Sequence, residues 1–261
     1  MRNARCTLLG MTILISTAVP TAFSTALADT RPIRFLASDS WSMPLMQIEN
    51  SQPTDGILFQ IMTSLAAQVG SPAEFQVLPR LRLQAAMESG QADVRCNTAQ
   101  SWGPNLSGDY IWSLPLITQK EYLVGDAGHT APMDPAQLPV QKLGTVLGYN
   151  YASLQHYFDS RRLIRDDARN QVQVLMKLAA GRYEYAVSNQ MALNWFNSTQ
   201  PADQQLHALK LLDAQGLGCY VRNDPDVPVQ RILRTLLRMK MSGEIDRIIE
   251  RYSGSASTDQ R

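Results

Sequence analysis

Histidine and cysteine are scarce in this chain, which has three of each among its 261 residues. The sequence contains no metal-ligand spacing, no nucleophile elbow and no glycine-rich phosphate loop. These absences count against catalysis that depends on such groups. We therefore expect no metal, no cofactor and no catalytic residue, and we predict that the protein is not an enzyme.

Net charge and long apolar segments are also limited. The formal net charge is +1 at pH 7, which gives no sign of nucleic acid or of a strongly anionic partner. Beyond the N-terminal region, no apolar run is long enough to cross a membrane. The expected partner is therefore a small molecule.

The first 28 residues have the features of a cleaved signal peptide. Arg2 and Arg5 precede an apolar run from Cys6 to Val19, and Ala26-Leu27-Ala28 provides a cleavage site. The apolar run, about 14 residues, is too short to span a bilayer. We predict that residues 1–28 are removed and that the mature chain is periplasmic.

Removal of Cys6 leaves two cysteines, Cys96 and Cys219, in an oxidising compartment. Their number suggests one disulfide, but two unrelated buried thiols fit the residues as well. The sequence pattern alone leaves both alternatives open.

Helical and strand patterns alternate along the chain, which is typical of an α/β fold with parallel strands. The first unit is expected to have strands at residues 31–38, 73–78 and 92–96, and helices at 57–69 and 83–88. After a loop rich in proline and small residues, at 127–139, the second unit is expected to have strands at 142–147, 163–165 and 183–187, and helices at 152–158, 171–180 and 191–196. Strands at 120–125, 208–212 and 216–222 and helices at 225–241 and 244–252 complete the expected elements.

The stretch from Leu83 to Thr98 identifies a candidate site, because a helix, a turn and a strand are followed by polar and aromatic residues. Ligands of open α/β sheets bind outside the carboxyl ends of the strands. We therefore expect a binding surface at Asn97 to Trp102. A second polar and aromatic group follows the first strand, from Asp39 to Leu45.

In their order and spacing, several short segments resemble type II periplasmic solute-binding proteins of the family that serves polar amino-acid transporters. The matching segments are Ser38 to Leu45, Gly56 to Ile61, Ser89 to Asp93, Trp112 to Leu116 and Gly243 to Tyr252. The resemblance covers nearly the whole mature chain. It implies two α/β lobes joined by two crossing strands, with the ligand in the cleft between them.

Carried over to this chain, the resemblance implies that lobe one comprises residues 29–122 and 218–261, and lobe two residues 126–215. The hinges would be Leu123 to Gly125 and Gln215 to Leu217, and the lobes would close on the ligand by bending there. In this topology the strand that begins at Gly218 runs antiparallel beside the strand that ends at Cys96. The resemblance therefore predicts a Cys96–Cys219 disulfide.

The cleft departs from the family pattern at both charged positions of an amino-acid site. The arginine that would clamp an α-carboxylate is absent from Thr98 to Pro104, and Ser188-Asn189 stands where an acid would hold the ammonium. An ordinary α-amino acid is therefore a doubtful ligand, and the cleft looks more neutral, polar and aromatic. Arg80, after the strand at 73–78, is either a replacement clamp or a solvated arginine at a helix start. Arg95 lies within a strand and is expected to be structural or paired with a carboxylate.

The predicted ligand contacts come from both lobes. They are Asp39, Trp41, Arg80, Asn97, Thr98 and Trp102 from lobe one, and Tyr149, Asn150, Tyr151, Ser188 and Asn189 from lobe two. The aromatic residues Trp41, Trp102 and Tyr149 either stack on the ligand or pack at the rim. Asn150 and Tyr151 either offer free backbone N–H groups to an anion or cap a helix.

The favoured function is capture of a small polar or aromatic solute, without catalysis, for an inner-membrane ABC-type permease. The alternatives are a periplasmic sensing or redox-accessory protein, and an enzyme similar to the cyclohexadienyl dehydratases that this fold also resembles. An enzyme needs an acid or base in the cleft, where the sequence indicates Asp39 alone. A monomer is the expected state.

Overall fold

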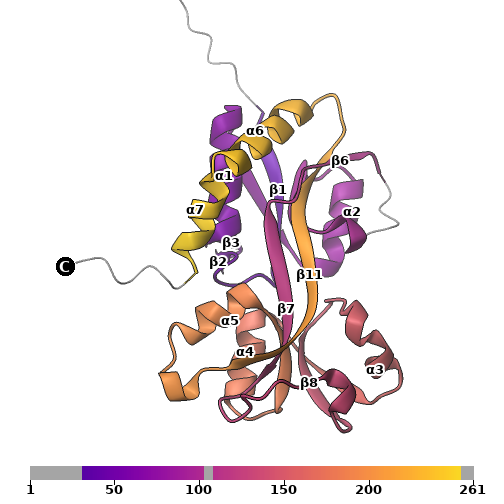
Figure 1. Cartoon of the computed structure of the whole chain (residues 1–261). Coiled ribbons are helices and arrows are strands. Elements are labelled where there is room, and N and C mark those ends of the chain that lie inside the picture. The colour runs from indigo at the N-terminus through magenta and orange to yellow at the C-terminus, as the bar shows by residue number, and fades with distance from the viewer. Residues whose placement is uncertain (1–30, 103–107, 254–261) are drawn as a thin grey trace, which may run out of the picture.

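The computed structural model describes residues 31–102 and 108–253. The predicted signal peptide, residues 1–28, lies outside this range, as do Gly103 and Pro104. Two lobes stand one above the other and are joined by two long neighbouring strands, β7 (Ile117–Gly125) and β11 (His207–Arg222) (Figure 1). No helix within the described ranges has the length and apolar character needed to cross a membrane.

The upper lobe is built on a sheet in which β1 (Ile33–Ser38) pairs in parallel with β4 (Ala73–Leu78) and β5 (Val94–Thr98). The last part of β11 pairs antiparallel with β5 and with β6 (Tyr110–Trp112). Three helices, α1 (Ile57–Val69), α6 (Val229–Met241) and α7 (Glu244–Arg251), lie on one side of this sheet, and α2 (Leu83–Glu88) lies on the other (Figure 1). A hairpin of β2 (Gln47–Glu49) and β3 (Gln52–Asp55), which the sequence did not predict, precedes α1.

The lower lobe has a sheet in the order β11-β7-β10-β8-β9. In it β8 (Gln141–Val146) runs parallel to β10 (Tyr185–Asn189) and to the edge strand β9 (Leu163–Ala168). Its helices are α3 (Gln155–Asp159), α4 (Gln171–Ala179) and α5 (Gln190–Asn197). Short 3₁₀ turns occur in both lobes, at Arg80–Arg82, Gln100–Trp102, Pro135–Gln137, Ala152–Leu154 and Ala202–Gln204.

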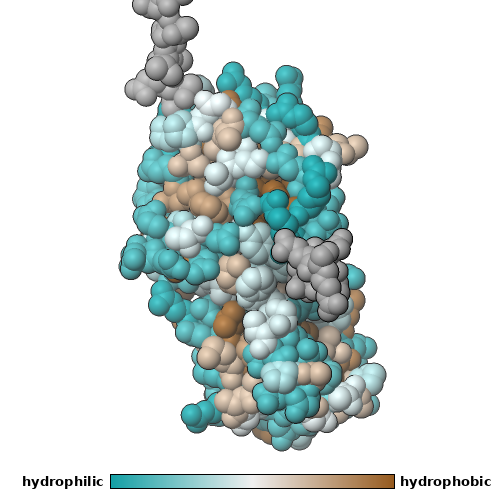
Figure 2. Space-filling view, turned by 90° about the vertical axis from the view of Figure 1, so that its left-hand side faces the viewer, coloured by the Kyte–Doolittle hydropathy of each residue, from teal (hydrophilic) through white to brown (hydrophobic). Residues whose placement is uncertain are grey.

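One exposed face of the molecule is shown in Figure 2, which views the side where α1, α5, α6 and α7 lie in Figure 1. This face is mainly hydrophilic, and hydrophobic residues appear on it only in small groups. Scattered apolar residues of this kind are usual for a surface in contact with water.

The crossing strand β11 is continuous, whereas the sequence predicted two strands separated by a break. The polar residues Asp213 to Gln215 caused this error, because they look like a turn in the sequence. In the structure they pair with β7, from Glu121 to Gln119. Register shifts at Ala208/Lys210 and Leu211/Asp213 let β11 bend while it stays paired.

The predicted hinge at Leu123 to Gly125 stays a prediction, and in this structure these residues pair with β10 in the lower-lobe sheet. Leu123 and Val124 are fully buried in the two hydrophobic clusters of the lower lobe. Up to Leu217, β11 pairs with the start of β7, and from Gly218 onward it pairs with β5. The lobes therefore meet at the first residues of β7, opposite Gln215 to Leu217. The exact residues at which each lobe ends stay a prediction.

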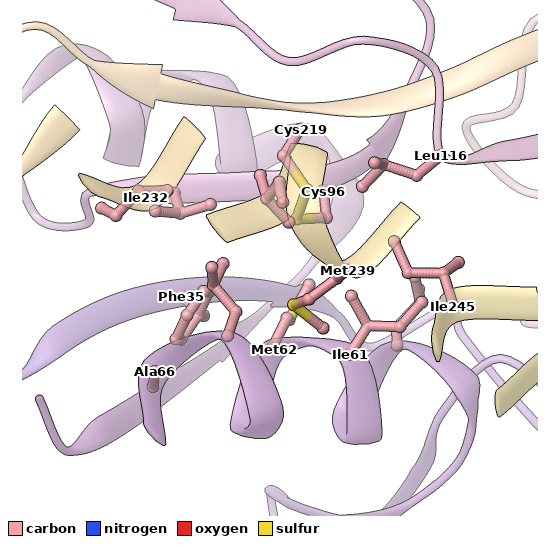
Figure 3. Close-up of a cluster of buried hydrophobic side chains, with 14 of the residues drawn as sticks. Phe35, Ile61, Met62, Ala66, Cys96, Leu116, Cys219, Ile232, Met239 and Ile245 are labelled. Carbon is pink, nitrogen blue, oxygen red and sulfur yellow. A yellow bond between two sulfur atoms is a disulfide. The ribbon is translucent and has the colours of Figure 1, made fainter. Parts of the chain in front are cut away.

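The core of the upper lobe confirms the predicted disulfide. Cys96 and Cys219 are register partners on β5 and β11, and they are joined by a disulfide. Both lie between the sheet and helices α1, α6 and α7, in a cluster with Phe35, Met62 and Met239 (Figure 3). The bond joins two residues that are 123 positions apart in the sequence. The chain between them includes the whole lower lobe.

A buried carboxylate, Asp93, joins the start of β5 to its neighbours. Its oxygens accept hydrogen bonds from Arg31 (Nη2, 3.0 Å), Arg34 (Nη2, 2.7 Å) and Arg222 (Nη2, 3.1 Å). Burial alone would raise the pKa of Asp93, but these bonds outweigh it and hold that pKa at about 2. Asp93 thus has a structural role, since three cations neutralise it.

Asp93→Asn should lower the free energy of unfolding by about 3 kcal/mol, because it leaves three arginines without their shared carboxylate. Because the folded pKa is depressed, the contribution of Asp93 to stability is present above about pH 4 and is lost as the pH falls toward 2. Urea denaturation at pH 7 measures the loss. The control is Asp226→Asn, which alters an exposed partner of two of these arginines, Arg31 and Arg222, and should cost less than about 1 kcal/mol. Equal losses in the two variants would contradict this role.

Replacing both Cys96 and Cys219 by alanine should lower stability by about 2–4 kcal/mol, since the bond closes a long loop in the unfolded chain. Chemical denaturation of the mature protein, with and without a reductant, measures the effect. The reductant should destabilise the parent protein and leave the double variant unchanged. Two freely alkylated thiols in the exported parent protein would show that the bond does not form.

Candidate ligand-binding cleft

A cavity of about 540 Å³ lies between the two lobes. The upper lobe contributes the loop after β1, the β2–β3 hairpin and the end of β4, and the lower lobe contributes the start of α4. Predicted contacts Asp39 and Trp41 line this cavity, together with Met43, Arg169 and Asn170. The cavity therefore has walls from both lobes, as a ligand site between lobes requires.

A larger groove, of about 870 Å³, lies along the first part of α6. Its lining runs from Asn223 to Arg238 and includes Gln68 of α1. All of these residues belong to the upper lobe, so closing the lobes would not change this groove. We therefore place the candidate site between the lobes, although the cavity there is smaller.

Charged groups bridge the interlobe cavity. Arg169 follows β9 directly, and its Nη2 lies 3.4 Å from Asp39 Oδ2 across the cavity. The next residue, Asn170, caps α4 by accepting a hydrogen bond from Gln173 N at 2.9 Å. Trp41 packs its side chain into the upper core. The cavity thus combines a partly exposed ion pair with an apolar wall.

A second contact between the lobes lies beside this cavity. The Arg80 guanidinium lies over the ring of Tyr149, 4.3 Å from its centroid, and Arg80 Nε donates to Gly148 O at 3.0 Å. The Tyr149 hydroxyl is hydrogen-bonded to Ser40 of the upper lobe, and burial raises the pKa of that hydroxyl. Arg80 is therefore not a solvated arginine at a helix start, because it bridges the lobes.

A carboxyl group that the sequence did not indicate lies near Arg80. Glu121 stands on β7 between Asn189 of β10 and Asp213 of β11. Burial and the Asp213 carboxylate raise the pKa of Glu121 to about 7, against a smaller opposing effect of Arg80. Among the described residues that line the interlobe cavity, Asp39 is the one acid, and Glu121 is not part of that lining.

Three predicted contacts lie at or just after the end of β5. Asn97 and Thr98 belong to the strand, and Asn97 forms a bulge there with φ 59°, a left-handed conformation that asparagine tolerates. The Oδ1 atom of Asn97 is buried and has no hydrogen-bond partner in the part of the chain that the structure describes. Thr98 is buried, and Trp102 is 40% exposed. Nearby, Arg95 Nη1 donates to the Tyr220 hydroxyl at 3.2 Å, which agrees with a structural role.

Three other predicted contacts are used within the lower lobe. Tyr151 is buried, and its hydroxyl accepts a hydrogen bond from Val146 N at 3.0 Å. Ser188 is fully buried at the end of β10, and Asn189 caps α5 by accepting from Ala192 N at 2.8 Å. These interactions hold the lobe together and leave these side chains little access to a ligand. Asn150, by contrast, is exposed.

Sequence reasoning missed Arg169 and Glu121 for different reasons. The strand before Arg169 was predicted to end at Arg165, whereas β9 continues to Ala168 and places Arg169 at its carboxyl end. Asp39 was predicted because ligands bind outside the carboxyl ends of strands. With the correct end of β9, the same rule would have predicted Arg169. Glu121 is an ordinary polar position within a strand, and only the pairing of β7 with β10 and β11 sets its neighbours, Asn189 and Asp213.

Comparisons with known proteins confirm the predicted fold. No family model matches the sequence, and no curated protein matches it. Among solved structures, an arginine-specific periplasmic binding protein from Salmonella typhimurium is 16% identical with a TM-score of 0.67, covering 85% of this chain and 99% of that one. An ancestral arginine-binding protein bound to arginine is 17% identical with a TM-score of 0.68, covering 85% and 97%. A histidine kinase sensor domain similar to periplasmic binding proteins is 17% identical with a TM-score of 0.68, covering 86% and 97%.

These similarities, together with the two lobes and their paired connecting strands, show that the chain has the two-lobed type II periplasmic binding protein fold. At such low identity they show the fold alone.

Glu121→Gln should make the protein more stable than the parent at pH 8, and this gain should be smaller at pH 5. The pKa of Glu121 is higher in the folded protein than in an unfolded chain, so stability falls as the pH rises from about 4.5 to 7. Glutamine removes this loss, and the expected gain at pH 8 is about 1 kcal/mol, or about 2–4 °C in the melting temperature.

Thermal unfolding of the parent and the variant across this pH range measures the effect. For Glu184→Gln, which changes an exposed glutamate of the same lobe, the melting temperature should change with pH in parallel with that of the parent. A parallel curve for Glu121→Gln as well would show that the carboxyl has no raised pKa.

Proposed function

We propose that the protein is a periplasmic solute-binding protein that captures a small polar or aromatic solute between its lobes without catalysis. The observation that carries the proposal is the cavity of about 540 Å³ with walls from both lobes. A solute in this cavity would contact Asp39 and Trp41 on one side and Arg169 on the other. Binding would then favour the closed arrangement, because it adds contacts that exist only when the lobes are together.

The chemistry of the cleft supports a polar solute with a flat or apolar portion. Trp41 provides an apolar wall in the cavity, and Tyr149 lies beside it under Arg80. Asp39 and Arg169 provide the charged groups of the cavity, which can bind polar groups of a solute. Binding therefore combines aromatic packing with a few directed polar contacts.

We further propose that the bound solute is delivered to an inner-membrane ABC-type permease, and that the protein acts as a periplasmic monomer. Deleting its gene should then abolish uptake of the solute at low concentration, and a plasmid copy should restore uptake. Unchanged uptake, with a lost transcriptional response to the same solute, would instead assign the protein to sensing.

The binding role is tested by a thermal-shift screen of the mature, oxidised protein, first unfolded and refolded to remove any carried-over solute. The panel contains amino acids, opines, polyamines, aromatic acids, alcohols and sugars. A solute at about 100 times its dissociation constant should add about 2.7 kcal/mol of stability.

The variant Asp39→Asn, at the cavity, should reduce the ligand-induced shift in melting temperature. The variant Asp226→Asn, which changes an exposed residue of the upper lobe outside the cavity, should not. Silence of the parent protein across the whole panel would contradict the proposed function.

A second candidate function, an enzyme on the same fold, is favoured by one observation. The pKa of Glu121, raised to about 7, suits a general acid at neutral pH, and Arg80 lies close enough to affect that pKa. Each solute that binds is therefore incubated with protein at one hundredth of its concentration and followed by NMR. Conversion that disappears in Glu121→Gln would establish the enzyme, and an unchanged solute would leave the binding role.

A further inference from the structure

We propose that the groove beside α6 is a docking site for an acidic segment of a partner protein. The groove, of about 870 Å³, is lined by the first part of α6, by the loop before it and by Gln68 of α1. Helix α6 begins at the end of the upper lobe that lies away from the lower lobe (Figure 1). The inference goes beyond solute capture and does not depend on it.

Three arginines, Arg231, Arg234 and Arg238, form the basic part of this lining. Their spacings of three and four residues place them on one face of α6. All three are exposed, and none of them forms an ion pair with a residue that the structure describes. The ion pairs of neighbouring cations are made instead by Arg222 and Lys240. The groove therefore carries three positive charges that have no counterpart in the described chain.

The three guanidinium groups keep most of their hydrogen-bonding capacity. The side chain of Arg234 makes no hydrogen bond to the described residues. Arg231 Nη1 donates to the last backbone carbonyl of α1 at 3.3 Å. Arg238 Nη2 donates to Gln68 Oε1 at 3.3 Å and to Thr235 Oγ1 at 3.4 Å. Because each guanidinium has five N–H donors in a fork that matches a carboxylate, most of these donors are left for an anion from outside the chain.

The acidic residues around the groove do not neutralise it. Asp224 is the one acid among the described residues that line it, and it pairs with Arg222. Glu244 accepts a hydrogen bond from Gln68 Nε2 at 2.9 Å, but in the described part of the chain it pairs with no arginine. The first turn of α6 contains Arg231 and no acid, although the helix dipole disfavours a cation there. A carboxylate from a partner would offset this unbalanced charge.

The shape of the groove favours a peptide over a membrane surface. Pro225, Val227 and Pro228 line it together with the arginines, so that it offers apolar as well as basic contacts. From Arg231 to Arg238 the helix rises by about 10 Å, which about three residues of extended chain span. A short acidic run therefore reaches all three arginines, whereas the broad surface of a bilayer does not enter a groove. Because the lining belongs to one lobe, the partner can dock whether the lobes are open or closed.

The test uses the mature, oxidised protein and a labelled peptide of about twelve residues in which glutamate alternates with serine. Fluorescence anisotropy at low ionic strength measures its binding. The peptide should bind, and its affinity should fall as salt is added, because exposed charges are screened. A peptide with glutamine in place of every glutamate should bind at least about 10-fold more weakly.

The groove variant, Arg231→Gln with Arg234→Gln and Arg238→Gln, should weaken binding of the acidic peptide by about 10–100-fold, because three charged contacts are lost. A matched control removes the same charge at three exposed arginines outside the groove, Arg82→Gln, Arg161→Gln and Arg182→Gln. This control should bind the acidic peptide like the parent.

Hydrogen exchange of the parent protein, with and without the acidic peptide, provides a measurement that does not depend on the folding of a variant. Exchange should slow between Asn223 and Arg238, along the groove, and should stay unchanged from Asp39 to Gln47 at the interlobe cavity. Protection at the cavity alone would contradict the inference.

Three further outcomes would overturn the docking site. These are failure of the acidic peptide to bind, equal losses in the groove variant and its control, and binding to vesicles of phosphatidylcholine and phosphatidylglycerol that the groove variant loses while the peptide does not bind the parent. The last outcome would assign the groove to a membrane surface. None of them bears on the interlobe cavity, which the thermal-shift screen tests separately.

Discussion

The pairing of β7 with β11 is the interaction on which the rest of this structure depends. These strands pair along nearly the full length of β7 and carry the chain between the lobes. Where β11 leaves β7, it joins β5 and is fixed there by the Cys96–Cys219 disulfide. The same strand pair sets Glu121 opposite Asp213. One ladder of backbone hydrogen bonds therefore sets both the lobe arrangement and the position of a charged group.

Two carboxyl groups of the protein, Asp93 and Glu121, have opposite pKa shifts because their surroundings differ. Asp93 has three arginine partners and a pKa held at about 2, which is the pattern of a structural carboxylate. Glu121 lies near a second carboxylate and has a pKa raised to about 7, because burial and the Asp213 carboxylate disfavour its charged form. The contrast separates a carboxylate whose charge is neutralised by cations from one whose charge is disfavoured by its surroundings.

Local signals predicted the helices and strands well, but not the interactions between the lobes. The periodicity of α1 and the glycine after it located that helix at Ile57–Val69, as found. Composition could not show that the polar run Asp213 to Gln215 continues a strand, because its pairing with β7 is long-range. Of the predicted contacts, Asp39 and Trp41 line the cavity because they follow the end of a parallel strand. Tyr151 and Asn189 were candidates by the same rule, yet packing and capping use them inside the lower lobe.

The central claim, that a solute binds between the lobes and contacts both, is tested most directly by hydrogen exchange with and without a solute that stabilises the protein. The account predicts slower exchange in two separate segments at once, Asp39 to Gln47 in the upper lobe and Arg169 to Gln173 in the lower lobe. Exchange along the groove beside α6, from Val229 to Arg238, should stay unchanged. Protection confined to that groove, or to a single lobe, would contradict the account.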